Sequence, residues 1–284
     1  MSSIVPLSAA LALALGGTAP QPPAAAQSAL LHGAPWQVEI YSNFAGYSDD
    51  ERKAKPLWEL AHRCGGSLIA EQWVLTAAHC VNQQQVDKGW RVRLGTRDLA
   101  SGRGITYRID RVIRHGRYDP DSHVNDIALV HFTADAETAR SNPARIAAIR
   151  LNGSRRTDQA IGGGVPVTVT GWGKSSEGPN GRSTQLLMAA DLKSVACDSA
   201  PAYAGRTNDT MLCAAAPGED SCQGDSGGPL ILTSGDPVLV GIVSWGDGCA
   251  EPGHPGVYVR IDRDHYLDWI KRAMAADPRV SGLN

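Results

Sequence analysis

Short apolar runs separated by turn residues dominate the chain from residue 35 onward. The runs are rich in Val, Ile, Leu, Trp and Tyr and are bounded by Gly, Pro, Asn or Asp, which is the pattern of β-strands. Many short strands joined by turns predict an all-β sandwich or barrel. The expected strands lie within 36–41, 67–77, 90–95, 105–113, 126–132, 165–173, 229–233, 237–246 and 256–261.

One helical period interrupts this pattern near the C-terminus. In the stretch DHYLDWIKRAMAA, Tyr266, Ile270 and Met274 fall on one stripe at helical spacing. Leu267 lies beside this stripe and widens the apolar face. The pattern predicts a helix over 264–276 that packs on the strands.

Length and composition are those of a folded protein with one large or two modest domains. The 284 residues are 42% hydrophobic, which is enough to bury a full core. The polar segment 134–164 ends in three glycines and divides the expected strands into two groups. We therefore expect the connection between domains there. The chain shows no internal repeat of clear period.

The charges exclude two classes of partner. Lys and Arg number 27 against 29 Asp and Glu, which gives a net charge of −2. No block of five or six like charges occurs. We therefore expect neither nucleic acid nor an anionic membrane as a partner. Beyond the N-terminal region, no run of about 18 apolar residues predicts a membrane span.

The N-terminal segment 1–26 differs from the rest of the chain. Its apolar run PLSAALALALGG is followed by a Pro-rich stretch that ends in the small residues Ala24 to Ala26, as in a secretory signal. No Lys or Arg precedes the apolar run, and a disordered Ala/Pro tail is the alternative. We expect a signal-like segment and a secreted or periplasmic protein.

The cysteine count favours disulfides over metal ligands or free thiols. An even number in an exported chain is typical of a disulfide framework, and six cysteines allow 15 pairings. No C-x-x-C pair occurs, so a zinc site is not expected. The six are Cys64, Cys80, Cys197, Cys213, Cys222 and Cys249.

The stretch EDSCQGDSGGPL contains the strongest candidate for chemistry, Ser226. A Gly/Ser/Asp cluster is in most proteins only a loop. A nucleophilic serine, however, needs a base to take its proton and a third group to orient that base. His79 in WVLTAAHC and Asp126 in NDIALVHF supply both types upstream. Taken singly, a lone histidine is more often structural, and an aspartate before a strand is more often a turn residue.

Together these motifs resemble the trypsin-like (chymotrypsin-fold) serine peptidases. LTAAHC, DIALV and GDSGGP occur in that family's order of His, Asp and Ser, with CGGSLI, GWG, SWGDGC and PGVYVRI in the family's intervals. The resemblance covers about 35–276 and implies two six-stranded antiparallel β-barrels packed together, with a C-terminal helix. Within a peptidase domain at 27–284, it places barrel one at about 30–135, a connection at about 136–164, barrel two at about 165–262 and the helix at 264–276.

The resemblance also implies a mechanism without cofactor or metal. Ser226 attacks a peptide carbonyl, His79 takes the proton and returns it to the leaving amine, and Asp126 holds the imidazole in the right tautomer. The N–H groups of Gly224 and Ser226 form the oxyanion hole. The stretch 97–104 has a single acid, so no calcium site is carried over.

The family pattern assigns every cysteine to a disulfide. The first would brace the turn that carries His79, and the third would tie the loop of Ser226 to the opposite wall of the substrate pocket. The implied pairs are Cys64 with Cys80, Cys197 with Cys213, and Cys222 with Cys249.

Asp220 carries the predicted substrate specificity. It lies six residues before Ser226, where trypsin-like members have the acid at the base of the specificity pocket. An unpaired buried carboxylate is costly, so the pocket favours a cationic side chain. We expect a monomer that cuts protein or peptide substrates after Arg or Lys; a solvated loop acid is the alternative for Asp220. The remaining pocket residues would be Ser244, Trp245, Gly246 and Gly256.

Two segments depart from the family pattern. A charged insertion at about 42–60 replaces a short loop, and in this family that loop borders the leaving-group side of the cleft. The usual Ile/Val-Val-Gly-Gly terminus, whose ammonium pairs with the acid before the nucleophile, is missing ahead of the first strand. We expect Asp225 to have an internal partner instead, with His62 the first candidate.

Two other functions compete with proteolysis. An α/β-hydrolase esterase uses the order Ser, acid, His and a G-x-S-x-G elbow, whereas here the serine comes last in G-D-S-G-G. A catalytically silent family member that only binds is the remaining alternative. It has no need of His79, Asp126 and Ser226 together, so we favour the enzyme.

Overall fold

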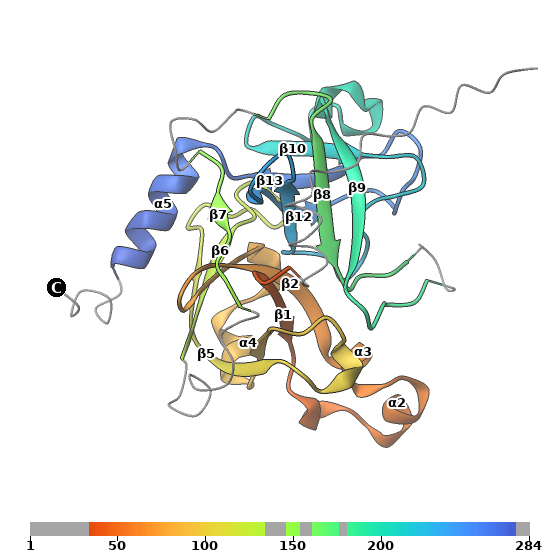
Figure 1. Cartoon of the computed structure of the whole chain (residues 1–284), viewed down its shortest axis with the longest axis vertical. Coiled ribbons are helices and arrows are strands. Elements are labelled where there is room, and N and C mark those ends of the chain that lie inside the picture. The colour runs from red at the N-terminus through yellow and green to blue at the C-terminus, as the bar shows by residue number, and fades with distance from the viewer. Residues whose placement is uncertain (1–33, 134–145, 154–160, 176–180, 277–284) are drawn as a thin grey trace, which may run out of the picture.

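Two β-barrels make up most of the molecule (Figure 1). The computed structural model describes residues 34–133, 146–153, 161–175 and 181–276. The signal-like segment 1–26 and most of the predicted connection at 136–164 lie outside the described residues. No helix in the described ranges is long and apolar enough to cross a membrane.

The first barrel is closed by six antiparallel strands in the order β1-β2-β3-β6-β5-β4. Its strands alternate apolar side chains into a shared core, and closure leaves no free strand edge. Core residues include Val38, Ile40, Val74, Leu75, Val92 and Leu129. The strands are β1 (Gln37–Tyr41), β2 (His62–Ala70), β3 (Trp73–Thr76), β4 (Arg91–Leu94), β5 (Ile105–Arg114) and β6 (Ala128–Thr133).

The second barrel contains the strands after the connection, in the order β11-β8-β9-β10-β13-β12, and a β11–β12 pairing closes it. The predicted architecture of two six-stranded antiparallel barrels is therefore confirmed. The short strand β7 (Arg150–Leu151), which the sequence analysis did not predict, pairs parallel with β12. The barrel strands are β8 (Pro166–Gly171), β9 (Met188–Val195), β10 (Met211–Ala215), β11 (Pro229–Leu232), β12 (Val238–Trp245) and β13 (Gly256–Arg260).

Strands β9 and β10 escaped the sequence analysis for different reasons. Half of the residues of β9 are exposed, and Met188 at its start has 55% of its surface accessible, so the apolar residues of this strand do not mark one buried face. β10, MLCAA, is a mostly buried run of only five residues, which is too short to stand out. Both are fixed by pairing with their neighbours, which local sequence does not show.

The C-terminal helix α5 (Asp264–Ala275) is the predicted one. Tyr266 and Ile270 are buried in the core cluster that includes barrel one, and Met274 packs against it. The Tyr266 hydroxyl donates to Asn125 Oδ1 at 3.1 Å. The helix thus also supports the loop that leads to Asp126.

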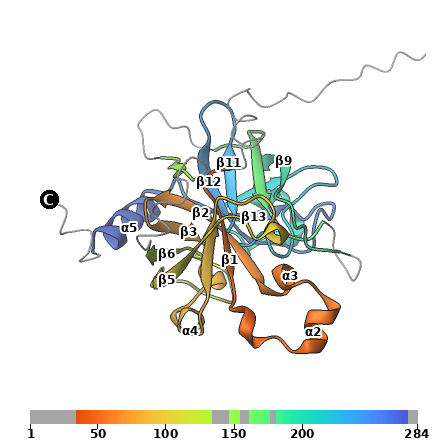
Figure 2. The same cartoon turned by 60° about the horizontal axis from the view of Figure 1, so that its bottom comes forward.

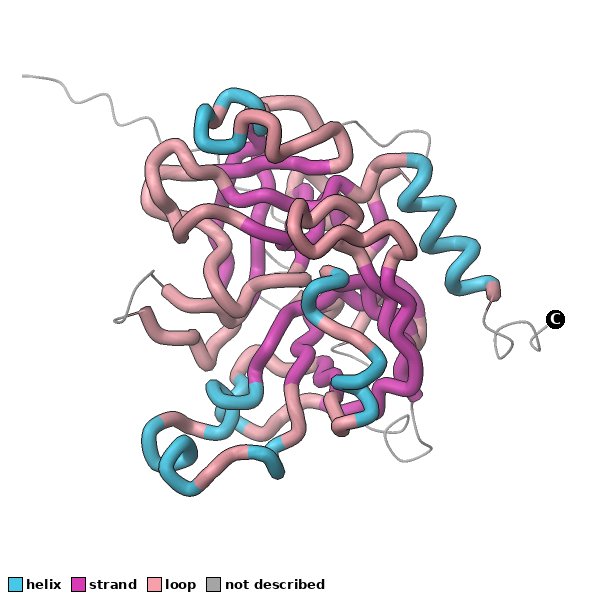
Figure 3. Tube along the Cα trace, turned by 180° about the vertical axis from the view of Figure 1, so that it is seen from behind, coloured by secondary structure: helices cyan, strands magenta, loops and turns pink. Residues whose placement is uncertain are grey.

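The insertion forms helices and not a loop. Figure 2 shows α2 and α3 projecting beside the β1 and β2 strands. Ser48 and Glu51 form a capping box that starts α2, which has no buried residue. The tube view in Figure 3 shows short helices at the periphery of both strand groups. They are η1 (Phe44–Gly46), α2 (Asp49–Ala54), α3 (Leu57–Ala61), η2 (Ala78–Cys80), α4 (Gln83–Asp87), η3 (Leu99–Ser101), η6 (Cys197–Ser199) and η7 (Pro201–Tyr203).

Candidate active site

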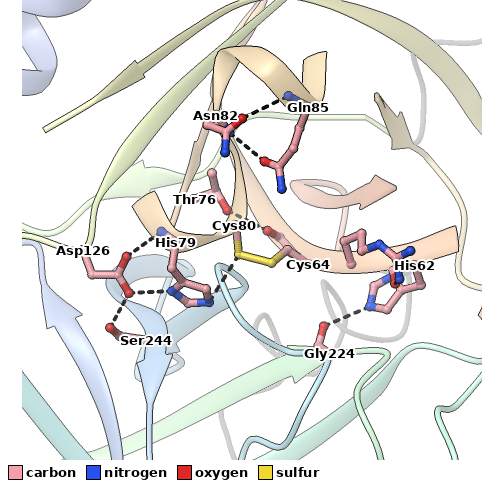
Figure 4. The surroundings of a disulfide bond; sticks show 12 residues. His62, Cys64, Thr76, His79, Cys80, Asn82, Gln85, Asp126, Gly224 and Ser244 are labelled. Atoms are coloured by element: carbon pink, nitrogen blue, oxygen red, sulfur yellow. Dashed lines mark hydrogen bonds and ion pairs between the residues drawn. A yellow bond between two sulfur atoms is a disulfide. The ribbon is translucent and has the colours of Figure 1, made fainter. Parts of the chain in front are cut away.

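The predicted base and its orienting acid come from neighbouring strands. β3 and β6 pair antiparallel with Thr76 opposite Ala128, so the end of β3 and the start of β6 lie at one edge of the barrel. His79 lies in η2 just after β3, and Asp126 just precedes β6. His79 Nδ1–H donates to Asp126 Oδ2 over 2.7 Å and its backbone N–H donates to Oδ1 over 2.9 Å (Figure 4). Strand register therefore joins two residues that are 47 positions apart.

The surroundings of Asp126 keep its carboxylate charged. The side chain is fully buried, and burial alone would raise the pKa of this group. The side chains of His123, His79 and Ser244 outweigh burial and hold the pKa of Asp126 well below its usual range. Ser244 Oγ–H donates to Asp126 Oδ2 over 2.6 Å. An ionised acid in this position fixes the Nδ1–H tautomer of His79.

Ser226 lies on a tight turn that packs against the strands leading to His79. Its carbonyl oxygen accepts a hydrogen bond from the Gly65 N–H in β2 over 2.8 Å. Gly227 follows with φ at 76°, and a Cβ there would lie 2.1 Å from Thr76 Oγ1 and 2.6 Å from the Gly65 carbonyl oxygen. Only glycine permits this approach, which explains why glycine follows the serine.

The backbone N–H groups around Ser226 alternate between paired and unpaired. Those of Asp225 and Gly227 donate to backbone carbonyls over 2.9 and 2.8 Å. Within the described part of the chain, those of Gly224 and Ser226 have no hydrogen-bond acceptor. These are the two donors that the sequence predicts for an oxyanion hole.

Asp225 has backbone partners and no direct bond to a histidine within the described residues. The N–H of Gly173 donates to Asp225 Oδ1 over 2.7 Å, and that of Cys222 donates to Oδ2 over 2.9 Å. Burial raises the pKa of Asp225, against the lowering effect of these two bonds and of the more distant His62. The internal partners of the Asp225 carboxylate are therefore the backbone N–H groups of Gly173 and Cys222.

His62 contacts the oxyanion-hole segment in a different way from the one predicted. Its Nε2–H donates to the Gly224 carbonyl oxygen over 2.9 Å (Figure 4). Its Nδ1 lies 3.4 Å from buried Glu39, whose carboxylate also pairs with Arg93 at 3.0 Å. The buried acid orients the ring toward Gly224, so the expected direct pair with Asp225 does not form.

One small cavity brings the predicted pocket residues together with Ser226. Its volume is about 150 Å³. Asp220 is partly buried in it, accepting bonds from the N–H groups of Ser221 and Ala250 over 2.7 and 3.2 Å. Burial raises the pKa of Asp220 to about 6, although these bonds oppose the shift. The predicted residues in the lining are Asp220, Ser226, Ser244, Trp245, Gly246 and Gly256.

Glycine is required beside the pocket acid. A Cβ at Gly256 would lie 2.6 Å from Asp220 Oδ1 and 3.0 Å from the Tyr258 hydroxyl. The absence of a side chain at Gly256 therefore leaves the cavity as wide as the backbone allows on this side. Ser244, predicted only as a pocket residue, also donates to Asp126 and so connects the pocket to the His79–Asp126 pair.

His123 is a site residue that the sequence analysis missed. Its Nδ1 lies 3.7 Å from Asp126 Oδ2, and its ring lies between those of His79 and Trp245, with centroids at 5.8 and 6.4 Å. The backbone of His123 has φ at 55°. The spacing H-x-x-D before the strand was its only signal in the sequence.

The disulfides have the pairing that the family resemblance implied. Cys64–Cys80 joins β2 to the turn of His79, Cys197–Cys213 joins η6 to β10, and Cys222–Cys249 joins the Ser226 loop to the far side of the cavity. No free cysteine occurs in the chain segments that the structure describes. The loops that carry the site are thus covalently fixed.

Comparison with known proteins relates this arrangement to one family. The Trypsin family model matches residues 25–270. Trypsin from Squalus acanthias is 38% identical over 250 residues, which are 86% of this chain and 93% of that protein. Trypsin-1 from Astacus astacus is 36% identical over 250 residues, which are 86% of this chain and 96% of that protein.

A solved structure agrees with the sequence relatives. Neuropsin, a serine protease expressed in the limbic system of mouse brain, matches with a TM-score of 0.68 at 31% sequence identity. The match covers 86% of this chain and 96% of that chain. Because sequence and fold agree over most of its length, this chain belongs to the trypsin family of serine endopeptidases, which has the chymotrypsin fold.

Proposed function

We propose that this endopeptidase cuts protein and peptide substrates after Arg or Lys, using His79, Asp126 and Ser226 as a catalytic triad. The observation that carries the proposal is the cavity that Ser226 and Asp220 line together. A cationic side chain held in this cavity by the carboxylate would leave the following carbonyl carbon beside the serine. The family membership supports the same chemistry.

In the proposed reaction, Ser226 Oγ attacks the carbonyl carbon while His79 Nε2 accepts its proton. Ionised Asp126 stabilises the imidazolium that forms. The negative charge on the tetrahedral oxygen is met by the N–H groups of Gly224 and Ser226, each worth about 3 kcal/mol in such sites. His79 then gives the proton to the leaving amine, and water releases the acyl group by the same steps in reverse.

The chemistry of the pocket supports a long cation as the preferred side chain. Desolvation already raises the pKa of Asp220, which means that its charge lacks a full set of partners. The head group of an Arg or Lys side chain supplies the missing partner of the Asp220 carboxylate, whereas a neutral side chain leaves this carboxylate unpaired. The glycines at 246 and 256 place no side chain in the path of a long substituent.

Assay of the exported protein tests the proposal. We propose that it is secreted or periplasmic and acts as a monomer, as three disulfides favour an oxidising compartment. N-terminal sequencing of the exported form is expected to begin at Gln27, and mass spectrometry of a digested peptide mixture to show cuts after Arg and Lys. A binding module would release no products, and cuts after aromatic or aliphatic residues would contradict the assignment of the pocket.

Binding of a small aryl amidinium should weaken in acid because the Asp220 carboxyl group becomes neutral. With a pKa of about 6, the carboxylate is ionised at pH 7 and mostly protonated at pH 5. Calorimetry should therefore show about a tenfold loss of affinity between about pH 7 and about pH 5. The Asp220→Asn variant is the matched control, and its residual binding should not change over this range. Equal affinity of the unaltered protein at both pH values would contradict the role of Asp220.

A further inference from the structure

His123 has a buried nitrogen that the proposed mechanism does not use. Its Nδ1 has no hydrogen-bond partner within the described residues and lies 3.7 Å from Asp126 Oδ2, beyond hydrogen-bonding distance. Leaving a buried polar atom unpaired has a cost, so such an atom next to a carboxylate and a second imidazole points to a ligand. The ring of His123 is about one-third exposed, which leaves a route from solvent.

The three side chains together have the geometry of a cation site. Ligand atoms of His79, His123 and Asp126 all lie within 4.8 Å of one another. Tetrahedral zinc, with bonds of about 2.0 to 2.1 Å, separates its ligand atoms by about 3.4 Å. The 3.7 Å between His123 Nδ1 and Asp126 Oδ2 is close to this value, and the 2.7 Å between His79 Nδ1 and the same oxygen must widen slightly.

The donor types favour zinc over other common cations. Two imidazoles and one carboxylate suit zinc, whereas calcium and magnesium prefer oxygen ligands alone. The other described cluster within coordination distance, around Cys64 and Cys80, is excluded because these cysteines form a disulfide. The sequence did not indicate a metal because His79 lies 47 residues before Asp126 and belongs to no C-x-x-C or H-x-x-x-H pattern.

We propose that His79, His123 and Asp126 form an inhibitory zinc site, with the Nδ1 atoms of both rings and Asp126 Oδ2 as ligands and water in the fourth position. Zinc takes the lone pair of His79 Nδ1, and the single proton of the neutral ring moves to Nε2. Nε2 then has no lone pair with which to accept the proton of Ser226, so the bound enzyme is silent until zinc leaves. This consequence for activity rests on the proposed role of His79; the binding site itself does not.

Inhibition is measured with an Arg peptide substrate, with zinc chloride added in a buffer that does not chelate metals. We expect reversible inhibition that a chelator relieves. Asparagine tolerates the positive φ of residue 123 and lacks an imidazole, so His123→Asn keeps the backbone and removes the ligand. The zinc concentration for half inhibition, relative to the zinc-free rate of each variant, should rise at least about tenfold. His265→Asn, which changes an exposed histidine on α5, is the matched control and should not alter inhibition.

Calorimetric titration of zinc into the Ser226→Ala variant separates the metal site from the catalytic proposal. This variant keeps all three ligands and needs no activity for the measurement. One zinc should bind, and adding His123→Asn should weaken that binding at least about tenfold. Equal zinc affinity with and without His123 would overturn the proposed site, even if the enzyme cuts after Arg as proposed. Zinc binding in a protein that never hydrolyses peptides would support the site and contradict the proposed function.

Discussion

Replacing Ser226 with alanine is expected to lower kcat on an Arg peptide by about 10⁶-fold. The substitution removes the Oγ that we propose forms the acyl-enzyme. The turn stays in place, because the Ser226 carbonyl oxygen still accepts a hydrogen bond from the Gly65 N–H and glycine still follows at 227. What remains is the acceleration due to the oxyanion hole and to substrate binding. Steady-state hydrolysis, with active-site titration to exclude contaminating protease, measures the effect.

Retained ligand binding would show that the Ser226→Ala variant is folded. An aryl amidinium should bind the variant with nearly unchanged affinity, because the Asp220 pocket is intact. Ser199→Ala, which changes a serine hydroxyl in η6 outside the cavity, is the matched control and should keep full activity. A residual kcat above about one per cent in the Ser226 variant would rule out this serine as the nucleophile.

Replacing Asp220 with serine is expected to lower kcat/KM for Arg and Lys peptides by about 10⁴-fold. The variant leaves the cationic head group of the substrate in a partly desolvated slot without a counter-charge, which is more costly than leaving it in water. The bond from Ser244 to Asp126 does not involve Asp220, so the chemistry of proton transfer is preserved. Competition between Arg, Lys and neutral peptides in one mixture measures the change in preference directly.

Replacing a second acid outside the pocket shows whether the effect comes from the charge in the pocket or from the net charge of the protein. Asp236→Ser removes an exposed acid from the loop between β11 and β12 and should leave the preference for Arg and Lys peptides unchanged. Peptides with a neutral residue before the cut should be hydrolysed by Asp220→Ser at least as fast as by the unaltered enzyme. If Arg and Lys peptides are still cut as fast, the specificity assignment is wrong.

The fold was predictable where burial follows a simple period along the chain. Strands such as β6 and β12 are apolar runs, and α5 has its buried stripe at helical spacing. β9 was not predictable because half of its residues are exposed and its place depends on pairing with β8 and β10. Helix α2 of the insertion begins at a capping box, which an interpretation based on charge alone does not take into account.

The candidate site could be predicted from the sequence where each of its residues lies in a short motif of its own. It was less predictable where a residue contacts partners that are far away in the sequence. His79, Asp126 and Ser226 each lie in a short motif, and the cavity residues were named on the same basis. The partner of His62 was predicted wrongly because the ring is oriented by Glu39, a buried acid whose position depends on closure of barrel one. Contacts of this kind arise from packing and leave no mark in local sequence.

The capping box of α2 has a consequence for self-digestion. With the proposed specificity for Arg and Lys, the enzyme would have two cutting sites in its own insertion. These are Arg52 and Lys53, both exposed on a helix that buries no side chain. Proteases act on the locally opened chain, so the rate of such a cut follows the opened fraction of the helix. The capping hydrogen bonds between Ser48 and Glu51 stabilise the closed form of the helix by about 1 kcal/mol, which lowers the opened fraction about fivefold. If the proposed specificity holds, the lifetime of the enzyme at high concentration depends on a helix cap that takes no part in the catalytic chemistry.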